Sequence, residues 1–252
     1  MKTVSYLKGT PTKLHVLDFG LFQVHANDRI IGICGFLIHT SAGEKVLVDT
    51  GFHRKYITDP HGSALEDGMN KFGRILKLGP MNFPKEQLSL TGIDVSDIDL
   101  LIITHTHIDH VGGIADFPNC PILMSAAERS LERPLYWADI QPLEWPNREY
   151  QLLENDSLIG PGFRVLMTPG HAPGQISIEL ELPETGTTLL TSDAISRPTE
   201  INDGFGGSWN EFQAKDSFLR LMDRAKEMDA FVIFGHSPDQ WAKLRKTPKY
   251  YS

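Results

Sequence analysis

Cysteine is scarce in this 252-residue chain, which has only two, and a framework of disulfide bonds is therefore excluded. Cys34 and Cys120 each lie in an apolar segment without a second cysteine at metal-ligand spacing, so we predict two buried free thiols. Long apolar runs are missing as well: none reaches the length of about 18 residues typical of a membrane-spanning helix. The first residues also lack the apolar core of a secretory signal peptide, and we expect a cytoplasmic protein without a membrane partner.

The sequence has no excess of positive charge. Its 24 lysine and arginine residues face 32 aspartate and glutamate residues, which gives a formal net charge of -8 at pH 7. Such a balance argues against nucleic acid or anionic lipid as a partner. No repeat, low-complexity tract or linker interrupts the chain, and 40% of its residues are hydrophobic, so we expect residues 1–252 to form one domain.

Strand-like segments are frequent and are separated by turn residues. Residues 32–40 and 45–51, joined by a turn at 41–44, predict a β-hairpin, and residues 97–104 predict a buried strand. Two segments predict helices: one has Ser125 as its N-cap, and the other covers residues 210–228. In residues 210–228, six apolar residues have helical spacing: Phe212, Phe218, Leu219, Met222, Ala225 and Met228. Strand-rich segments with helices between them predict an α/β fold in which two sheets pack face to face under outer helices.

Residues 53–84 differ from their surroundings because they are rich in glycine, proline and polar residues. We expect irregular structure with short helices, in a segment long enough to act as a functional loop or lid. Met69, Phe72, Ile75 and Leu76 are spaced as one face of a short helix, for which core packing or a dimer contact is the favoured role.

Five of the ten histidines lie directly beyond predicted strands, where a rigid sheet can aim side chains into a site. Two aspartates share these positions, and the full set is His105, His107, Asp109, His110, His171, Asp193 and His236. Imidazole and carboxylate together suit zinc, and also iron, manganese or cobalt. Seven such groups exceed the coordination of one tetrahedral ion but suit two divalent ions that share a carboxylate. The other histidines have no partner at ligand spacing, and we expect structural roles for them: His15, His25, His39, His53 and His61.

The segment HTHIDH (residues 105–110) resembles the HxHxDH motif of the metallo-β-lactamase superfamily. VDTG (48–51), TPGH (168–171), SDA (192–194) and FGH (234–236) extend the resemblance over nearly the whole chain in order. The resemblance implies a four-layer αββα sandwich with the metals at one edge, between the sheets. It also implies a ligand scheme in which one ion is held by His105, His107 and His171, the other by Asp109, His110 and His236, and both are bridged by Asp193.

TPGHAPGQISIEL (168–180) and the residues from FGH onward are similar to the N-acyl-homoserine lactonases, which quench bacterial quorum signals. This similarity implies a dinuclear-metal hydrolase that acts on ester bonds, with zinc as the expected metal. In the implied mechanism a metal-bridging hydroxide attacks the lactone carbonyl, and Asp109 passes a proton to the leaving ring oxygen. The similarity is also compatible with a homodimer.

Two positions depart from the lactonase pattern. Those enzymes have a tyrosine three residues after the bridging aspartate, where this chain has Ser196, and many relatives have an aspartate in place of Ser237. Because this position has no phenol, three other substrate classes are alternatives to an N-acyl-homoserine lactone: a different lactone, an aryl ester or an organophosphate. An iron-dependent redox enzyme and a non-catalytic metal-binding protein are further alternatives.

Four residues near the expected site are candidates for substrate contact. Ile108 lies between ligands, Ser196 follows Asp193, and Phe205 and Trp209 lie in a glycine-rich loop. Ordinary packing is the alternative for Ile108, and packing against the following helix is the alternative for both aromatic residues. A small-molecule lactone or ester is thus the expected partner.

Overall fold

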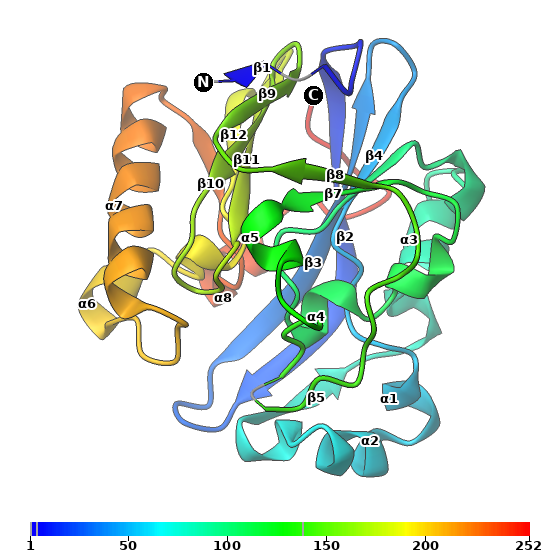
Figure 1. Ribbon diagram of the computed structural model, residues 1–252, viewed down its shortest axis with the longest axis vertical. Coiled ribbons are helices and arrows are strands. Elements are labelled where there is room, and N and C mark those ends of the chain that lie inside the picture. The colour runs from blue at the N-terminus through cyan, green and yellow to red at the C-terminus, as the bar shows by residue number, and fades with distance from the viewer. Residues whose placement is uncertain (1, 4, 138) are drawn as a thin grey trace.

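Two mixed β-sheets pack face to face in the computed structural model, and helices cover the outer face of each sheet (Figure 1). The structure describes residues 2–3, 5–137 and 139–252. Both the α/β class and the four-layer αββα arrangement predicted from the sequence are confirmed. None of the helices in the described ranges is long and apolar enough to cross a membrane.

The larger sheet has seven strands in the order β5-β2-β3-β4-β6-β7-β8. Their bounds are β2 (Pro11–Val24), β3 (Ile30–Thr40), β4 (Lys45–Val48), β5 (Gly73–Lys77), β6 (Leu100–Ile102), β7 (Ile122–Ser125) and β8 (Tyr150–Leu153). β3 and β4 form the predicted antiparallel hairpin, whereas β4, β6, β7 and β8 run parallel. Because parallel neighbours end at the same edge of a sheet, the segments that follow β4 and β6 lie side by side.

The smaller sheet has six strands in the order β1-β9-β10-β11-β12-β13. Their bounds are β1 (Lys2–Thr3), β9 (Ser157–Gly160), β10 (Phe163–Met167), β11 (Ile176–Leu182), β12 (Gly186–Leu190) and β13 (Phe231–Ile233). β12 and β13 pair in parallel, with Leu190 opposite Ile233. The segments that follow these two strands therefore leave the sheet at one edge, next to each other.

The longest helix, α7, covers the outer face of the smaller sheet, and α1 to α4 lie on the outer side of the larger one (Figure 1). The helices are α1 (Lys55–Thr58), α2 (Pro60–Glu66), α3 (Pro84–Ser89), α4 (Ile108–Val111), α5 (Ala126–Arg129), α6 (Glu200–Asp203), α7 (Glu211–Glu227) and α8 (Pro238–Trp241), and the 3-10 turns used below are η1 (Met69–Lys71) and η5 (Ser192–Ile195).

Side-chain caps start both helices that the sequence predicts. Ser125 Oγ accepts a hydrogen bond from Glu128 N at the start of α5, and Asn210 Oδ1 accepts one from Gln213 N at the start of α7. The apolar spacing correctly predicts the helix α7, but not all of the apolar residues with this spacing are buried. Phe212, for example, is 84% exposed. Leu219 and Met228 are also exposed. The buried face consists of Phe218 and Leu221 together with three small residues, Ala214, Ser217 and Ala225.

Apolar side chains fill the space between the sheets. Val48, Ile102 and Leu123 of the larger sheet belong to one cluster with Ile178 and Leu190 of the smaller sheet, and none is more than 2% exposed. A second cluster lies on the outer face of the larger sheet, and a third lies under α7. Because both faces of each sheet are covered, the central strands read as continuous apolar runs. The two predicted free cysteines are confirmed as buried and unbridged.

The short helix predicted around residues 69–76 is wrong in its second half. Residues 69–71 form η1, and β5 follows, pairing antiparallel with β2 so that Ile75 lies opposite Phe22. Met69 is 2% exposed, but Phe72 and Leu76 are 42% and 40% exposed. The long β2 presents a free edge there, and the hydrogen bonds of that edge outweigh a helical pattern of only four apolar residues.

Candidate metal centre

The segment 105–110 leaves the larger sheet at the end of β6. His107 has extended backbone angles (φ -69, ψ 160) and is the N-cap of α4, whose first turn contains Asp109 and His110. An extended segment places His105 and His107 on one side of the chain, and the change to helix turns the next two side chains back toward them. His105 is fully buried and His110 is 4% exposed.

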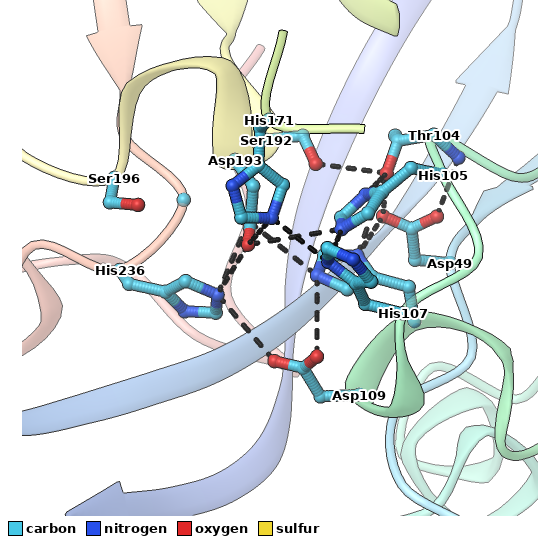
Figure 2. A network of polar contacts seen from close by, with 12 residues as sticks. Asp49, Thr104, His105, His107, Asp109, His171, Ser192, Asp193, Ser196 and His236 are labelled. Atoms are coloured by element: carbon cyan, nitrogen blue, oxygen red, sulfur yellow. Dashed lines mark hydrogen bonds and ion pairs between the residues drawn. The ribbon is translucent and has the colours of Figure 1, made fainter. Parts of the chain in front are cut away.

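His105, His107 and His171 form the first group of side chains (Figure 2). His107 Nδ1 lies 3.0 Å from His105 Nε2 and 2.9 Å from Nε2 of His171, which comes from the loop between β10 and β11. Burial, together with the neighbouring imidazoles, lowers the pKa of His105 and of His107 well below the usual value. Both rings are therefore neutral at pH 7, the form in which imidazole binds a metal.

Asp109, His110 and His236 form the second group. His236 Nε2 lies 3.5 Å from Asp109 Oδ2, and His110 Nε2 lies 3.8 Å from Asp109 Oδ1. His236 follows β13, and its Nδ1 lies 3.0 Å from the carbonyl oxygen of Gly32 on β3, which orients the ring across the two sheets. Burial opposes protonation of His236, but Asp193 and Asp109 outweigh it and raise its pKa to about 9. This corner of the centre thus favours positive charge.

Asp193 lies between the two groups, in the turn η5 that follows β12 (Figure 2). Its Oδ2 lies 3.3 Å from His171 Nε2 and 3.9 Å from His105 Nε2. Its Oδ1 lies 3.5 Å from His110 Nε2 and 3.2 Å from His236 Nε2. Burial alone would raise the pKa of Asp193, but His236 and His110 outweigh it and hold the pKa well below the usual value. This ionised carboxylate therefore contacts both groups, and its Oδ2 also lies 3.2 Å from His236 Nε2.

Two buried atoms of the centre have no hydrogen-bond partner among the described residues, namely His110 Nε2 and Asp193 Oδ1. An unpaired buried polar atom costs about 1–3 kcal/mol. Ligand atoms lie within 4.8 Å of one another in three sets: His105, His107 and His171; His105, His110 and Asp193; Asp109, His110 and His236. Imidazole and carboxylate donors in this arrangement fit two first-row divalent ions, which would also satisfy the two unpaired atoms. The five histidines predicted to be structural belong to none of these sets.

Asp49, at the end of β4, supports the centre from behind. Its carboxylate accepts hydrogen bonds from Thr104 N and Thr104 Oγ1, both at 2.8 Å, and lies 2.8 Å from His110 Nδ1. With the proton on Nδ1, the lone pair of His110 Nε2 points into the centre, so Asp49 selects the tautomer that can bind a metal. The VDTG motif at the end of a strand next to β6 is the sequence signal for this role, which we did not predict.

Glu128 is a second supporting residue that the sequence analysis missed. It is fully buried, and its Oε1 accepts hydrogen bonds from Thr106 N at 2.8 Å and Thr106 Oγ1 at 2.7 Å. Its Oε2 accepts from Gly174 N at 3.0 Å. One carboxylate thereby joins the loop that carries His105 and His107 to the loop that carries His171. Three residues after a serine N-cap, Glu128 has the sequence signature of an ordinary capping box, and this concealed its role.

The centre opens into a cavity of about 740 Å³ whose lining includes Asp109 and Asp193. Ile108, Ser196 and Trp209 also line it, and Trp209 is 62% exposed at the rim. Phe205 is not among the lining residues; its ring packs edge-on against Phe218 of α7, with centroids 5.8 Å apart. Three of the four residues expected near a substrate therefore reach the cavity, while Phe205 contacts the helix.

The sequence is similar to those of known proteins. The sequence matches the Metallo-beta-lactamase superfamily over residues 34–236. An N-acyl homoserine lactonase of Bacillus thuringiensis is 31% identical over 220 residues, which cover 85% of each chain. AttM, an N-acyl homoserine lactonase of Rhizobium radiobacter, is 28% identical over 98% of this chain and 97% of its own.

Solved structures agree with the sequence matches. A Bacillus thuringiensis AiiA mutant with N-decanoyl-L-homoserine bound at its active site superposes with a TM-score of 0.82, at 27% identity, over 96% of this chain and 100% of the other. An N-acyl homoserine lactone hydrolase with N-hexanoyl-L-homoserine bound at its catalytic metal centre gives a TM-score of 0.81 at 27% identity, again over 96% and 100% of the two chains. The protein therefore belongs to the metallo-beta-lactamase superfamily.

Proposed function

We propose that this protein hydrolyses the ester bond of a lactone, with an N-acyl homoserine lactone as the substrate and two divalent metal ions as cofactors. The observation that carries the proposal is the convergence of five histidines and two aspartates, two of their atoms buried and unpaired, at a cavity of about 740 Å³. The N-acyl homoserine lactonases at about 30% identity supply the substrate class.

In the proposed ligand scheme His105, His107 and His171 hold one ion, and Asp109, His110 and His236 hold the other. Asp193 joins the two, which its position between both groups supports. Two ions held there would polarise a substrate carbonyl and lower the pKa of a bound water. Because the ligands come from loops of both sheets, we also propose that the sheets act together as one hydrolase domain.

Lactone hydrolysis adds water across one C–O bond: the hydroxyl joins the carbonyl carbon, and the ring oxygen leaves with the remaining proton. Asp109 is the residue of this chain that we assign to the proton. Its carboxylate lines the cavity and is 14% exposed, so it can reach a bound substrate. It would accept the proton at a carboxylate oxygen and deliver it to the leaving ring oxygen. His236, 3.5 Å away, keeps that carboxylate oriented.

The cavity wall provides the contacts for the acyl chain. Phe22, Phe52 and Ile108 line one side and form an apolar surface on which an alkyl chain can pack. Ser196 lines the cavity near Asp193, and its backbone N donates a hydrogen bond to Glu200 Oε2 at 2.7 Å. A small residue at this position leaves room beside the centre, so we assign Ser196 and Trp209 to the substrate-binding wall. Phe205 is proposed to contribute through α7, by holding the loop that carries Trp209.

The test is acid release from a substrate panel by zinc-loaded protein. N-hexanoyl-homoserine lactone should be opened, and His107→Ala should abolish the reaction, whereas His61→Ala on the exposed helix α2 should retain it. The same panel contains an open-chain aryl ester and a phosphotriester. Turnover of these two without lactone opening would replace the lactonase proposal by a different hydrolase. No turnover of any substrate would contradict a hydrolytic function.

Other expectations from the sequence stay predictions. Zinc is our proposed native metal, with iron, manganese and cobalt as alternatives that the same ligands accept. Metal analysis of protein purified without added metal identifies it. A cytoplasmic location and a homodimer likewise remain to be tested, by cell fractionation and by light scattering.

A further inference from the structure

The cavity beside the metal centre has two chemically different walls. Phe22, Val24, Ile31 and Phe72 belong to an apolar wall on the side of β2, β3 and β5. The residues between η5 and α7 contribute charged side chains, and Arg29 of the β2–β3 hairpin lines the cavity as well. An alkyl chain requires only the apolar wall, so the charged groups point to a further feature of the ligand.

Arg197, one of the two arginines of the cavity, is neutralised within the protein. Its Nε and Nη2 donate to Asp203 Oδ2 at 3.0 and 2.7 Å, and its Nη1 lies 3.8 Å from Glu200 Oε1. The other oxygen of Glu200 accepts the hydrogen bond from Ser196 N. Both carboxylates near the arginines are therefore already engaged.

Arg29 differs from Arg197 because no carboxylate contacts it directly. Among the described residues its guanidinium has no carboxylate within ion-pair distance and no hydrogen-bond acceptor, and its Nε is buried without a partner. Burial, followed by the positive charge of Arg197, lowers the pKa of Arg29. The carboxylates of Glu200, Asp203 and Asp193 oppose this shift from beyond ion-pair distance. A guanidinium stays protonated at neutral pH, so this wall holds a half-buried cation that no carboxylate contacts directly. Keeping such a group unpaired costs free energy that a bound anion would recover.

The position of Arg29 in the sequence gives its approximate backbone distance from Gly32, which contacts the metal centre. It directly precedes β3, three residues before Gly32, whose carbonyl oxygen contacts His236 of the centre. With a strand rise of about 3.3 Å per residue, the two backbone positions lie about 10 Å apart. The hairpin that carries Arg29 extends beyond the neighbouring strands (Figure 1). Along this path, Val24 and Ile31 of the apolar wall lie on either side of the hairpin turn.

We propose that Arg29 binds a carboxylate at the far end of the substrate's acyl chain, so that the preferred substrate is a lactone whose acyl group ends in an anion. The inference rests on the proposed lactonase function and narrows its substrate class. From the backbone separation of about 10 Å, we choose an acyl chain of about six carbons, whose methylene groups would pack on the apolar wall.

The experiment compares two lactones that differ only in the end of the chain: N-hexanoyl-homoserine lactone, and N-adipoyl-homoserine lactone with a terminal carboxylate. The native protein should favour the adipoyl compound in kcat/KM by about 10-fold or more, the effect of one hydrogen bond to a charged group. Arg29→Gln should remove this preference through a higher KM for the adipoyl compound, and Arg29→Lys should keep part of it. Succinyl and suberoyl analogues should be poorer, because their carboxylates stop short of or overshoot the hairpin.

Arg74→Gln is the matched control. Arg74 is an exposed arginine of β5 on the same side of the molecule, and it does not line the cavity. Its loss removes the same charge and should leave the adipoyl-to-hexanoyl ratio intact. Equal kcat/KM values for both compounds in the native protein, or an equal fall for both in Arg29→Gln, would overturn the inference.

A binding measurement separates this inference from the proposed function. If no lactone is opened, the lactonase proposal fails, and the ring-opened N-adipoyl- and N-hexanoyl-homoserines are then titrated calorimetrically into the native protein and Arg29→Gln. Tighter binding of the adipoyl compound that Arg29→Gln abolishes would still support the carboxylate site. Equal binding of both compounds to the native protein would refute it.

Discussion

Asp49 and His110 are 61 residues apart in the sequence, yet their side chains meet at 2.8 Å behind the metal centre. The contact exists because β4 and β6 are parallel neighbours that end at the same edge. Asp49 also accepts hydrogen bonds from Thr104 N and Thr104 Oγ1, so the start of the ligand loop and the orientation of one ligand depend on a single carboxylate.

The first prediction concerns this carboxylate. Asp49→Ala should weaken binding of one of two zinc ions by about 10–100-fold, because His110 loses the partner that fixes its tautomer. Titration of the loaded protein with a chromophoric chelator measures the stoichiometry and affinity of both ions. Asp216→Asn, an exposed acidic residue of α7, should behave as the native protein does. Two equally tight ions in Asp49→Ala would speak against the role given to Asp49.

A second prediction addresses the link between the two histidine loops. In Glu128→Gln the side-chain oxygen can still accept from Thr106, but the amide NH₂ faces the N–H of Gly174, and a hydrogen bond is lost. We expect the free energy of unfolding to fall by about 1–3 kcal/mol and the zinc affinity of the first histidine group to decrease. Urea unfolding and chelator titration give the two quantities. Glu132→Gln is the control, because Glu132 is an exposed glutamate four residues further along the chain. If the zinc affinity of Glu128→Gln equals that of the native protein, the role of Glu128 is purely structural.

The third prediction is a pH dependence that arises away from the centre. Burial opposes ionisation of Glu179 on β11, but hydrogen bonds and charge from Arg224 and Arg164 outweigh it and lower its pKa. A folded-state pKa below the unfolded value of about 4.3 gives a stabilisation that is complete above that value and is lost as the pH falls through the folded pKa.

Glu179→Gln should therefore be less stable than the native protein at pH 7, by about 1.5–3 kcal/mol. Its free energy of unfolding should also fall less steeply between about pH 5 and 3. Urea titrations at several pH values measure both effects. Glu181→Gln removes an exposed acid from the same strand and should reproduce the native pH dependence, and parallel curves for Glu179→Gln and the native protein would contradict the assignment.

The fourth prediction concerns cation choice. Imidazole nitrogens dominate the proposed ligand set, so zinc, manganese or cobalt should raise the Tm of chelator-treated protein, whereas magnesium, which prefers oxygen ligands, should not. Replacing a ligand in each group, as in His105→Ala and His236→Ala, should halve the bound zinc or abolish it. An equal Tm with every cation would argue that the seven side chains bind no metal.

Much of this architecture follows from local sequence patterns. Apolar runs such as residues 100–103 predict central strands, and histidines placed just beyond those strands predict side chains that meet at one edge. The edge strand β5 was missed because four apolar residues fit a helix as well as a strand, and the free edge of β2 decides between them. Glu128 and the proposed role of Arg29 were missed for a different reason. Glu128 binds residues far along the chain, and Arg29 shares a cavity with residues far along the chain, so only the packed loops bring these groups together.

The split of the centre between the sheets has a consequence for biosynthesis. The segment with the first four ligands precedes every strand from β7 onward, whereas His236 follows β13, the last strand along the chain. During synthesis the HTHIDH segment thus emerges with neither His171, Asp193 nor His236 available to it. A ribosome-bound chain has only part of the coordination set, so tight metal capture belongs to a stage after both sheets have folded. Metal ions in the cell are then bound by the folded protein and not by the nascent chain.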